Sequence, residues 1–156
     1  SPDLSFLATI DGKVVGSIAY THSRIVHEDG TSLPTITFGP ISVDPTMQRN
    51  GIGRALIEHS ARRAKEQGYR AIVIYGDPAY YGKIGFRIAE KFDLRTHDGK
   101  YAVSLQVLKL TGLDDDLSGV FEESAVFAEI DEQRVSEFDA TFSPRAKEYN
   151  TDSQSR

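Results

Sequence analysis

Runs of apolar and β-branched residues, separated by short polar stretches, predict strands in the first part of the chain. Residues Ser5–Ile10 form one such run and Val14–Val26 form a second. The dipeptide Asp11-Gly12 stands between them and is typical of a hairpin turn, because that turn needs positive φ at both central residues. The polar stretch His27–Leu33 predicts a loop. The chain is therefore expected to begin with an antiparallel hairpin.

A third apolar run, Pro34–Val43, is interrupted by Gly39-Pro40. Proline has no amide hydrogen to give to a sheet ladder, and glycine inside a strand often marks a bulge. We therefore expect this strand to kink at Gly39-Pro40 and to separate there from its neighbour.

The next segment, from about Gly51 to Gln67, predicts an amphipathic helix, and Gly68 suits the position after its end. The apolar positions recur at helical spacing and would pack one face on a sheet; they are Ile52, Leu56, Ile57, Ala61 and Ala64. Residues Ala71–Tyr75 follow as an apolar run typical of a strand buried on both faces. Strand, helix and strand in this order favour a right-handed βαβ unit.

The pattern beyond this unit is weaker. It predicts a short helix over Ala79–Ile84, strands near Arg87–Phe92 and Ala102–Leu110, and strand or turn in Leu117–Ile130 and Val135–Phe142. We expect one domain over residues 1–142 and a polar C-terminal tail over residues 143–156.

Composition narrows the function classes. The 156 residues suit one domain, and the absence of cysteine excludes disulfides, thiolate metal sites and a cysteine nucleophile. We predict no metal site. The net charge of −5 argues against non-specific nucleic-acid binding. The apolar runs are too short to cross a membrane, so a cytoplasmic protein is expected.

The stretch "QRNGIGRAL", Gln48–Leu56, predicts an anion site where strand gives way to helix. A helix begins with backbone N–H groups that lack internal acceptors and carries partial positive charge there. Gly51 and Gly53 would let a phosphate approach the main chain, and Arg49 and Arg54 add charge. The alternative is that the two glycines only permit a tight turn. A P-loop is excluded because Gly53 is followed by arginine rather than lysine, and a dinucleotide fingerprint would need a third glycine.

Two motifs resemble the GNAT superfamily of N-acetyltransferases. "VDPTMQRNGIGRAL" is similar to the family's acetyl-CoA loop, Gln/Arg-x-x-Gly-x-Gly/Ala, and "GDPAYYGKIGF" is similar to its Tyr-x-Lys-x-Gly-Phe element. The matching residues are Gln48, Gly51, Gly53, Tyr81, Lys83, Gly85 and Phe86. The resemblance covers roughly Leu4 to Leu110, and more weakly continues to Phe142. It implies an α/β (α+β) fold with a mixed, mostly antiparallel central sheet that splays at the acetyl-CoA site and carries helices on both faces.

The resemblance also implies direct transfer of an acetyl group from acetyl-CoA to an amine acceptor in a ternary complex. Tyr81 aligns with the family's catalytic tyrosine, which protonates the departing thiolate, although a packed ring at the core edge is the alternative for this residue. Val43 is expected to donate its N–H to the thioester oxygen. The residues expected to hold acetyl-CoA are Ile41, Ser42, Val43, Gln48, Arg49, Asn50, Gly51, Ile52, Gly53, Arg54, Asp77 and Tyr81.

Several points stay open on sequence grounds. The general base could be His22, Glu28 or Asp77, and the acceptor amine is not specified. A non-catalytic CoA-binding or sensory domain and a generic phosphate-binding domain are the competing functions. The family fold opens with a strand and two helices, which we expect to be missing from this chain. Family analogy suggests a homodimer built through the C-terminal strands.

Overall fold

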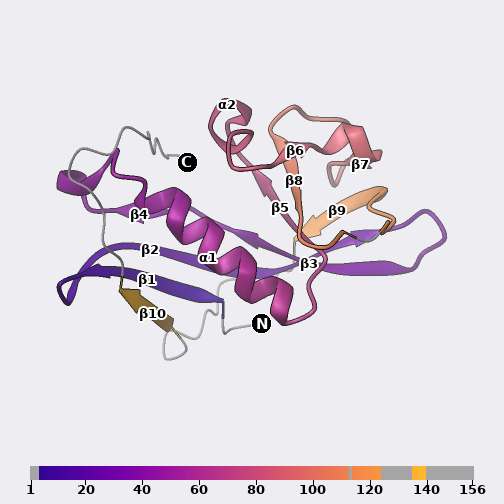
Figure 1. Cartoon of the computed structure of the whole chain (residues 1–156). Coiled ribbons are helices and arrows are strands. Elements are labelled where there is room, and N and C mark those ends of the chain that lie inside the picture. The colour runs from indigo at the N-terminus through magenta and orange to yellow at the C-terminus, as the bar shows by residue number, and fades with distance from the viewer. Residues whose placement is uncertain (1–3, 113, 124–134, 140–156) are drawn as a thin grey trace.

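The computed structural model describes residues 4–112, 114–123 and 135–139 (Figure 1). Its elements are, in order, β1 (Ser5–Ile10), β2 (Lys13–Val26), β3 (Ser32–Phe38), β4 (Ser42–Val43), the 3-10 helix η1 (Pro45–Met47), α1 (Ile52–Glu66), β5 (Ala71–Tyr75), α2 (Pro78–Tyr81), β6 (Arg87–Ile88), the 3-10 helix η2 (Ala89–Phe92), β7 (Leu94–Arg95), β8 (Leu105–Lys109), β9 (Gly119–Glu123) and β10 (Val135–Asp139). Across these ranges, no helix combines the length and the apolar character that crossing a bilayer requires.

The long strand β2 organises the sheet. One of its edges pairs with β1 and then, further along, with β9, and the other edge pairs with β4 and then with β3. The turn between β1 and β2 has φ of 52° at Asp11 and 81° at Gly12, which confirms the predicted hairpin. All four pairings of β2 are antiparallel, so β2 holds together strands that lie far apart in the sequence.

The rest of the sheet extends from β3. Strand β5 lies parallel to β3, with Ile36 opposite Ile72, and β8 follows antiparallel to β5. At the other end, β10 pairs with β1 in parallel. This mixed, mostly antiparallel sheet confirms the predicted fold class, and the parallel β3–β5 pair confirms the expected strand–helix–strand unit.

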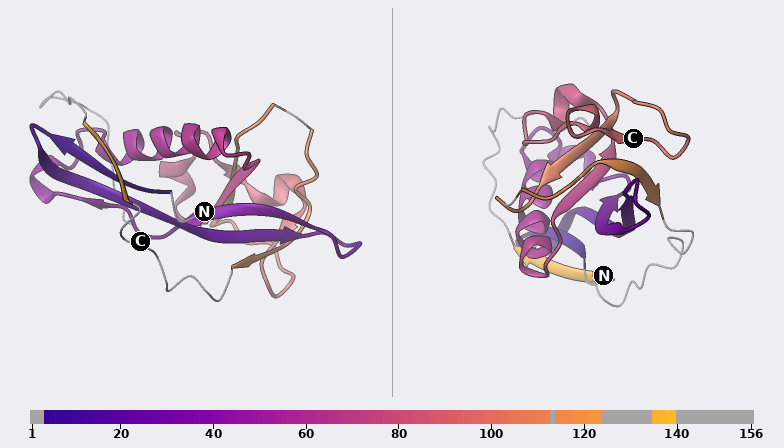
Figure 2. Two further views of the ribbon diagram at one scale, coloured as in Figure 1. Left: turned by 90° about the horizontal axis from the view of Figure 1, so that it is seen from below. Right: turned by 90° about the vertical axis from the view of Figure 1, so that its right-hand side faces the viewer.

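Helix α1 covers one face of the sheet, as the edge-on view shows (Figure 2, left). Its apolar side packs with alternate residues of β2, β3 and β5, including Ile18, Ile36 and Ile72. The intervening residues of β5 face the opposite side, where Val73 packs in a second cluster with Phe121 of β9. Because both faces of β5 are buried, its sequence is continuously apolar, as the pattern predicted.

The sheet opens between β4 and β5. Strand β3 ends at Phe38, the chain leaves the extended conformation at Gly39 and Pro40, and β4 resumes at Ser42. Beyond this break, within the described part of the chain, β4 pairs with β2 alone and no longer follows β5. The kink predicted at Gly39-Pro40 is therefore confirmed.

Several predicted elements were wrong in detail. Strand β8 begins at Leu105 rather than at Ala102, and β3 begins at Ser32, inside the loop expected over His27–Leu33. The strand expected over Arg87–Phe92 ends at Ile88, and a 3-10 helix follows that closes on Asp93 with φ of 58°. Helix α2 covers Pro78–Tyr81 and stops before Ile84, because the chain turns at Gly82 and Gly85. The predicted strand or turn beyond residue 123, apart from β10, and the tail over residues 143–156 lie outside the described residues.

Candidate functional site

The start of α1 presents backbone N–H groups without a competing acidic side chain. Gly51 caps the helix in the left-handed conformation, with φ of 78°, and no acidic residue occupies the first turn. The first hydrogen bond of the helix runs from the Ala55 amide to the Gly51 carbonyl at 3.0 Å. Helix geometry directs the amides before Ala55 out of the helix start, where partial positive charge gathers. This end of α1 is suited to an anion.

A strand glycine sets the position of this helix start. A methyl group at Gly16 of β2 would stand 2.9 Å from Ile52 Cγ2 and 3.1 Å from the Ser42 carbonyl. Only the absence of a side chain lets the first turn of α1 come so close to β2 and β4. Sequence reasoning missed Gly16, although a glycine inside a strand is a known signal of close backbone approach.

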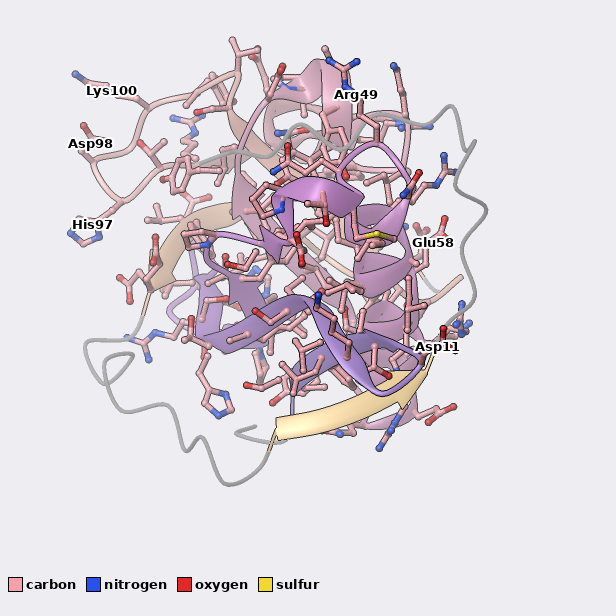
Figure 3. The ribbon with its side chains drawn as sticks, turned by 90° about the vertical axis from the view of Figure 1, so that its left-hand side faces the viewer. Asp11, Arg49, Glu58, His97, Asp98 and Lys100 are labelled. Carbon is pink, nitrogen blue, oxygen red and sulfur yellow. The ribbon has the colours of Figure 1, made fainter. Side chains whose placement is uncertain are left out.

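The two arginines near the helix start, Arg49 and Arg54, differ in their backbone conformation and surroundings. Arg49 has a positive φ of 72° and lies at the periphery (Figure 3). Arg54 is engaged by Glu58 one turn later on the helix surface, with Nε 2.9 Å from the carboxylate. This exposed ion pair offsets part of the Arg54 charge.

The loop before the helix is fixed by Asp44. Its carboxylate accepts hydrogen bonds from the Thr46 amide at 2.9 Å and from the Thr46 hydroxyl at 2.8 Å, and these bonds lower the pKa of Asp44. Pro45 occupies the first position of η1. The predicted site residues that follow this turn differ in exposure, with Gln48 exposed and Asn50 half-buried.

The main chain of β4 gives Val43 a distinct orientation. The Asp44 amide donates to the Val15 carbonyl of β2 at 2.7 Å. Successive amides of an extended chain point in opposite directions, so the Val43 N–H faces away from β2, toward the open edge beside β5. The main chain of Ser42 faces β2 instead. Of these two predicted residues, Val43 is thus the one whose amide faces the opening.

Tyr81 lies where the sheet opens. Asp77 caps the short helix α2 by accepting the Ala79 amide at 2.9 Å. The Tyr81 ring is 7% exposed and packs against Phe38, the last residue of β3, with ring centroids 5.9 Å apart. Its neighbour Tyr80 is also buried and packs edge-on against it at 4.9 Å. The Tyr81 side chain is therefore a packed ring placed beside the break in the sheet.

The candidate bases are not gathered at one point. Asp77 is the N-cap of the short helix that ends at Tyr81. Glu28 lies in the turn between β2 and β3, at the end of β3 away from Phe38. His22 lies exposed on β2, and partial burial lowers the pKa of its imidazole, which favours the neutral form that a base needs. Of the three candidates, Asp77 alone adjoins the helix that carries Tyr81.

A family comparison decides the class of this site. The model of the acetyltransferase (GNAT) domain matches residues 2–88, more than half of the chain. The chain belongs to this family. The matched residues of this GNAT chain include the β3–β4 break, the start of α1 and Tyr81, and the match confirms both the predicted family and the acyltransferase class.

Relatives and solved structures agree with this assignment. The GNAT chain is 35% identical over 118 residues to the uncharacterised N-acetyltransferase YhbS of Escherichia coli K12, which covers 75% of the chain and 68% of YhbS. The crystal structure of Escherichia coli YhbS in complex with CoA superposes with a TM-score of 0.64 at 30% identity, covering 78% of this chain and 66% of that one. A Brucella melitensis GNAT acetyltransferase in complex with acetyl-CoA gives a TM-score of 0.56 at 29% identity, covering 75% and 63%. The chain thus spans slightly less than two thirds of each solved chain.

Proposed function

We propose that the protein transfers an acetyl group from acetyl-CoA directly to an amine acceptor within a ternary complex. The observation that supports this most strongly is the meeting of three features at one break in the sheet. The start of α1, which has no side-chain cap, follows β4 after η1 and a short loop, the Val43 amide faces the open edge, and Tyr81 packs on Phe38 at the break.

The residues at the start of α1 fit the coenzyme. Its pyrophosphate needs several N–H donors aimed at one point, and the amides of Ile52 and Gly53 follow a glycine already in the left-handed conformation. The predicted contacts from Gln48 to Arg54 remain part of this proposal, as does a contact from Asp77. When bound, acetyl-CoA supplies the acetyl group as a thioester, which an amine attacks with loss of the CoA thiolate.

Two groups of this chain assist that exchange. The Val43 N–H donates a hydrogen bond to the thioester oxygen, where negative charge grows as the amine nitrogen bonds to carbon. The Tyr81 hydroxyl gives its proton to the departing sulfur and regains one from solvent. A phenol with a pKa of about 10 and a thiol with a pKa of about 8.5 are close enough for this transfer.

The attacking amine must also lose a proton, since an alkylammonium has a pKa of about 10.4. We place the base at Asp77, directly or through a water molecule, because it caps the short helix α2 that carries Tyr81. Asp77→Asn keeps the helix cap and removes the base, so its turnover in a thiol-release assay separates the capping role from the catalytic role. His22→Gln in that assay tests the alternative base.

A thiol-release assay over a panel of amines tests the function. We expect acetyl-CoA-dependent release of CoA thiol with at least one amine, together with an acetylated product of matching mass. Tight binding of acetyl-CoA with no thiol release from any amine would instead favour a non-catalytic CoA-binding domain. Equal binding of simple nucleotides and CoA would favour a generic phosphate-binding domain. Dimerisation through the C-terminal strands stays a prediction, which sedimentation analysis tests.

A further inference from the structure

A buried glutamine is hydrogen-bonded to the residue at which the Tyr81 turn begins. Gln106 of β8 is 1% exposed and stands opposite Ile74 of β5, in an otherwise apolar stretch. Its side-chain amide donates to the Gly76 carbonyl at 3.0 Å and to the Ser104 carbonyl at 3.3 Å. A buried side-chain amide is costly unless it is hydrogen-bonded, so an apolar residue would fill this position equally well if packing were its only role. What distinguishes the glutamine here is its pair of hydrogen bonds to the Gly76 and Ser104 carbonyls.

Gly76 is the point where β5 passes into the Tyr81 helix. Its amide donates to the Ser104 carbonyl at 2.9 Å, and its carbonyl accepts from Gln106. Both main-chain groups of Gly76 are thus tied to the segment that leads into β8. The Tyr81 ring rests directly on this glycine, since a methyl group there would stand 2.5 Å from Tyr81 Cε2. Movement of Gly76 must therefore move the ring.

We infer that Gln106 is a positioning residue, which fixes the Tyr81 hydroxyl through its hydrogen bond to the Gly76 carbonyl. The inference rests on the proposed function for its effect on turnover, but the placement of the ring is independent of that function. A positioning residue acts through Tyr81, so its removal should slow the chemical step and leave coenzyme affinity almost unchanged.

The test is a double-mutant cycle with Tyr81. We expect Gln106→Leu to lower kcat about tenfold and to change the acetyl-CoA KM by less than about twofold, as loss of a transition-state interaction does. In the Tyr81→Phe background, Gln106→Leu should lower kcat no further. An equal tenfold loss in both backgrounds would overturn the inference, because Gln106 would then act independently of Tyr81.

A second variant covers the case in which Gln106→Leu does not fold. Gln106→Glu keeps the shape, but the ionised carboxylate cannot donate to the Gly76 carbonyl, and protonation restores one donor. We expect kcat of Gln106→Glu, relative to the wild type, to recover as the pH is lowered. A ratio that stays constant with pH would contradict the inference.

Hydrogen exchange separates this inference from the proposed function. Amides over residues 76–82 should exchange about tenfold faster in Gln106→Leu or Gln106→Glu than in the wild type. Thr35→Val is the matched control, since Thr35 is also buried on a strand and bonded to Ser23 at 2.7 Å, away from this turn. Unchanged exchange over 76–82 overturns the positioning role whatever the enzyme does. Faster exchange in a chain that releases no thiol overturns the proposed function alone.

Discussion

The Tyr81 ring lies on the main chain of Gly76 so closely that no side chain fits between them. A methyl group at Gly76 would stand 2.5 Å from Tyr81 Cε2 and 2.8 Å from Cδ2. Contacts with Phe38 and Phe86 hold other parts of the ring. The glycine that opens "GDPAYYGKIGF" is therefore required by the tyrosine five residues later.

Gly76→Ala should displace the Tyr81 ring and slow catalysis. Because the added methyl group meets ring carbons and the ring is itself packed, we expect kcat to fall about tenfold or more, with the Kd of CoA changed by less than about threefold. Gly112→Ala is the control, since a methyl group there meets nothing within 4 Å. Steady-state kinetics and calorimetry measure both quantities. A kcat equal to that of the control would contradict this role of Gly76.

Removal of the Tyr81 hydroxyl tests the acid directly. Tyr81→Phe keeps the ring contacts and removes the proton donor, so kcat should fall about 100-fold or more while the affinity for CoA is retained. Tyr80→Phe is the matched control on the adjacent buried ring and should stay within a few-fold of wild type. Equal turnover of the two variants would assign the hydroxyl no part in the chemistry.

The left-handed conformation of Gly51 makes a prediction about coenzyme affinity. A side chain at φ of 78° costs about 1 kcal/mol or more, so Gly51→Ala should favour another backbone conformation and turn the following amides away. Binding must then restore the original turn, and the Kd of CoA should rise about fivefold or more. Gly51→Asn should lose less, because asparagine tolerates this conformation. Calorimetry showing the same Kd for all three chains would refute the argument.

The buried Tyr20 predicts how stability depends on alkaline pH. Burial raises the pKa of the Tyr20 hydroxyl, which bonds Ser60 Oγ at 2.7 Å, above its ordinary value of 10.0. The unfolded chain therefore releases this proton at a lower pH than the folded chain. The associated stability is present below about pH 10 and is lost as the pH rises further, by up to about 1.4 kcal/mol per pH unit.

Tyr20→Phe should remove that dependence. It costs about 1 kcal/mol at neutral pH through the lost hydrogen bond, but its free energy of unfolding should fall less steeply above pH 10. Urea denaturation across this range measures both slopes. Parallel curves for the two chains would show that Tyr20 ionises alike in the folded and unfolded states.

Local signals predicted much of this fold. The Asp11-Gly12 turn, the break at Gly39-Pro40 and the strand Ala71–Tyr75 all lie where turn chemistry and hydrophobic pattern put them. Each depends on neighbours a few residues away. Arg87–Phe92 shows the limit, because a short apolar pattern fits a strand or a turn, and here η2 follows β6 and ends at the left-handed Asp93.

Long-range pairing accounts for what the sequence could not predict. Arg24 pairs with Glu122, so β9 joins β2 across a sequence separation of 98 residues. The close approach at Gly16 and the hydrogen bond from Gln106 to Gly76 likewise exist only once distant strands have met. Sequence motifs therefore singled out the start of α1 and Tyr81. The residues that support these two positions, Gly16 and Gln106, could be identified only from the packed structure.

The most direct measurement compares CoA with pantetheine, which shares the thiol arm but lacks the pyrophosphate and nucleotide. If the amides at the start of α1 bind the pyrophosphate, calorimetry on the wild-type chain should show CoA binding at least about 100-fold more tightly than pantetheine, a difference of about 2.7 kcal/mol. Equal affinity for the two compounds, or no binding of CoA at millimolar concentration, would contradict the assignment of this helix start as the coenzyme site.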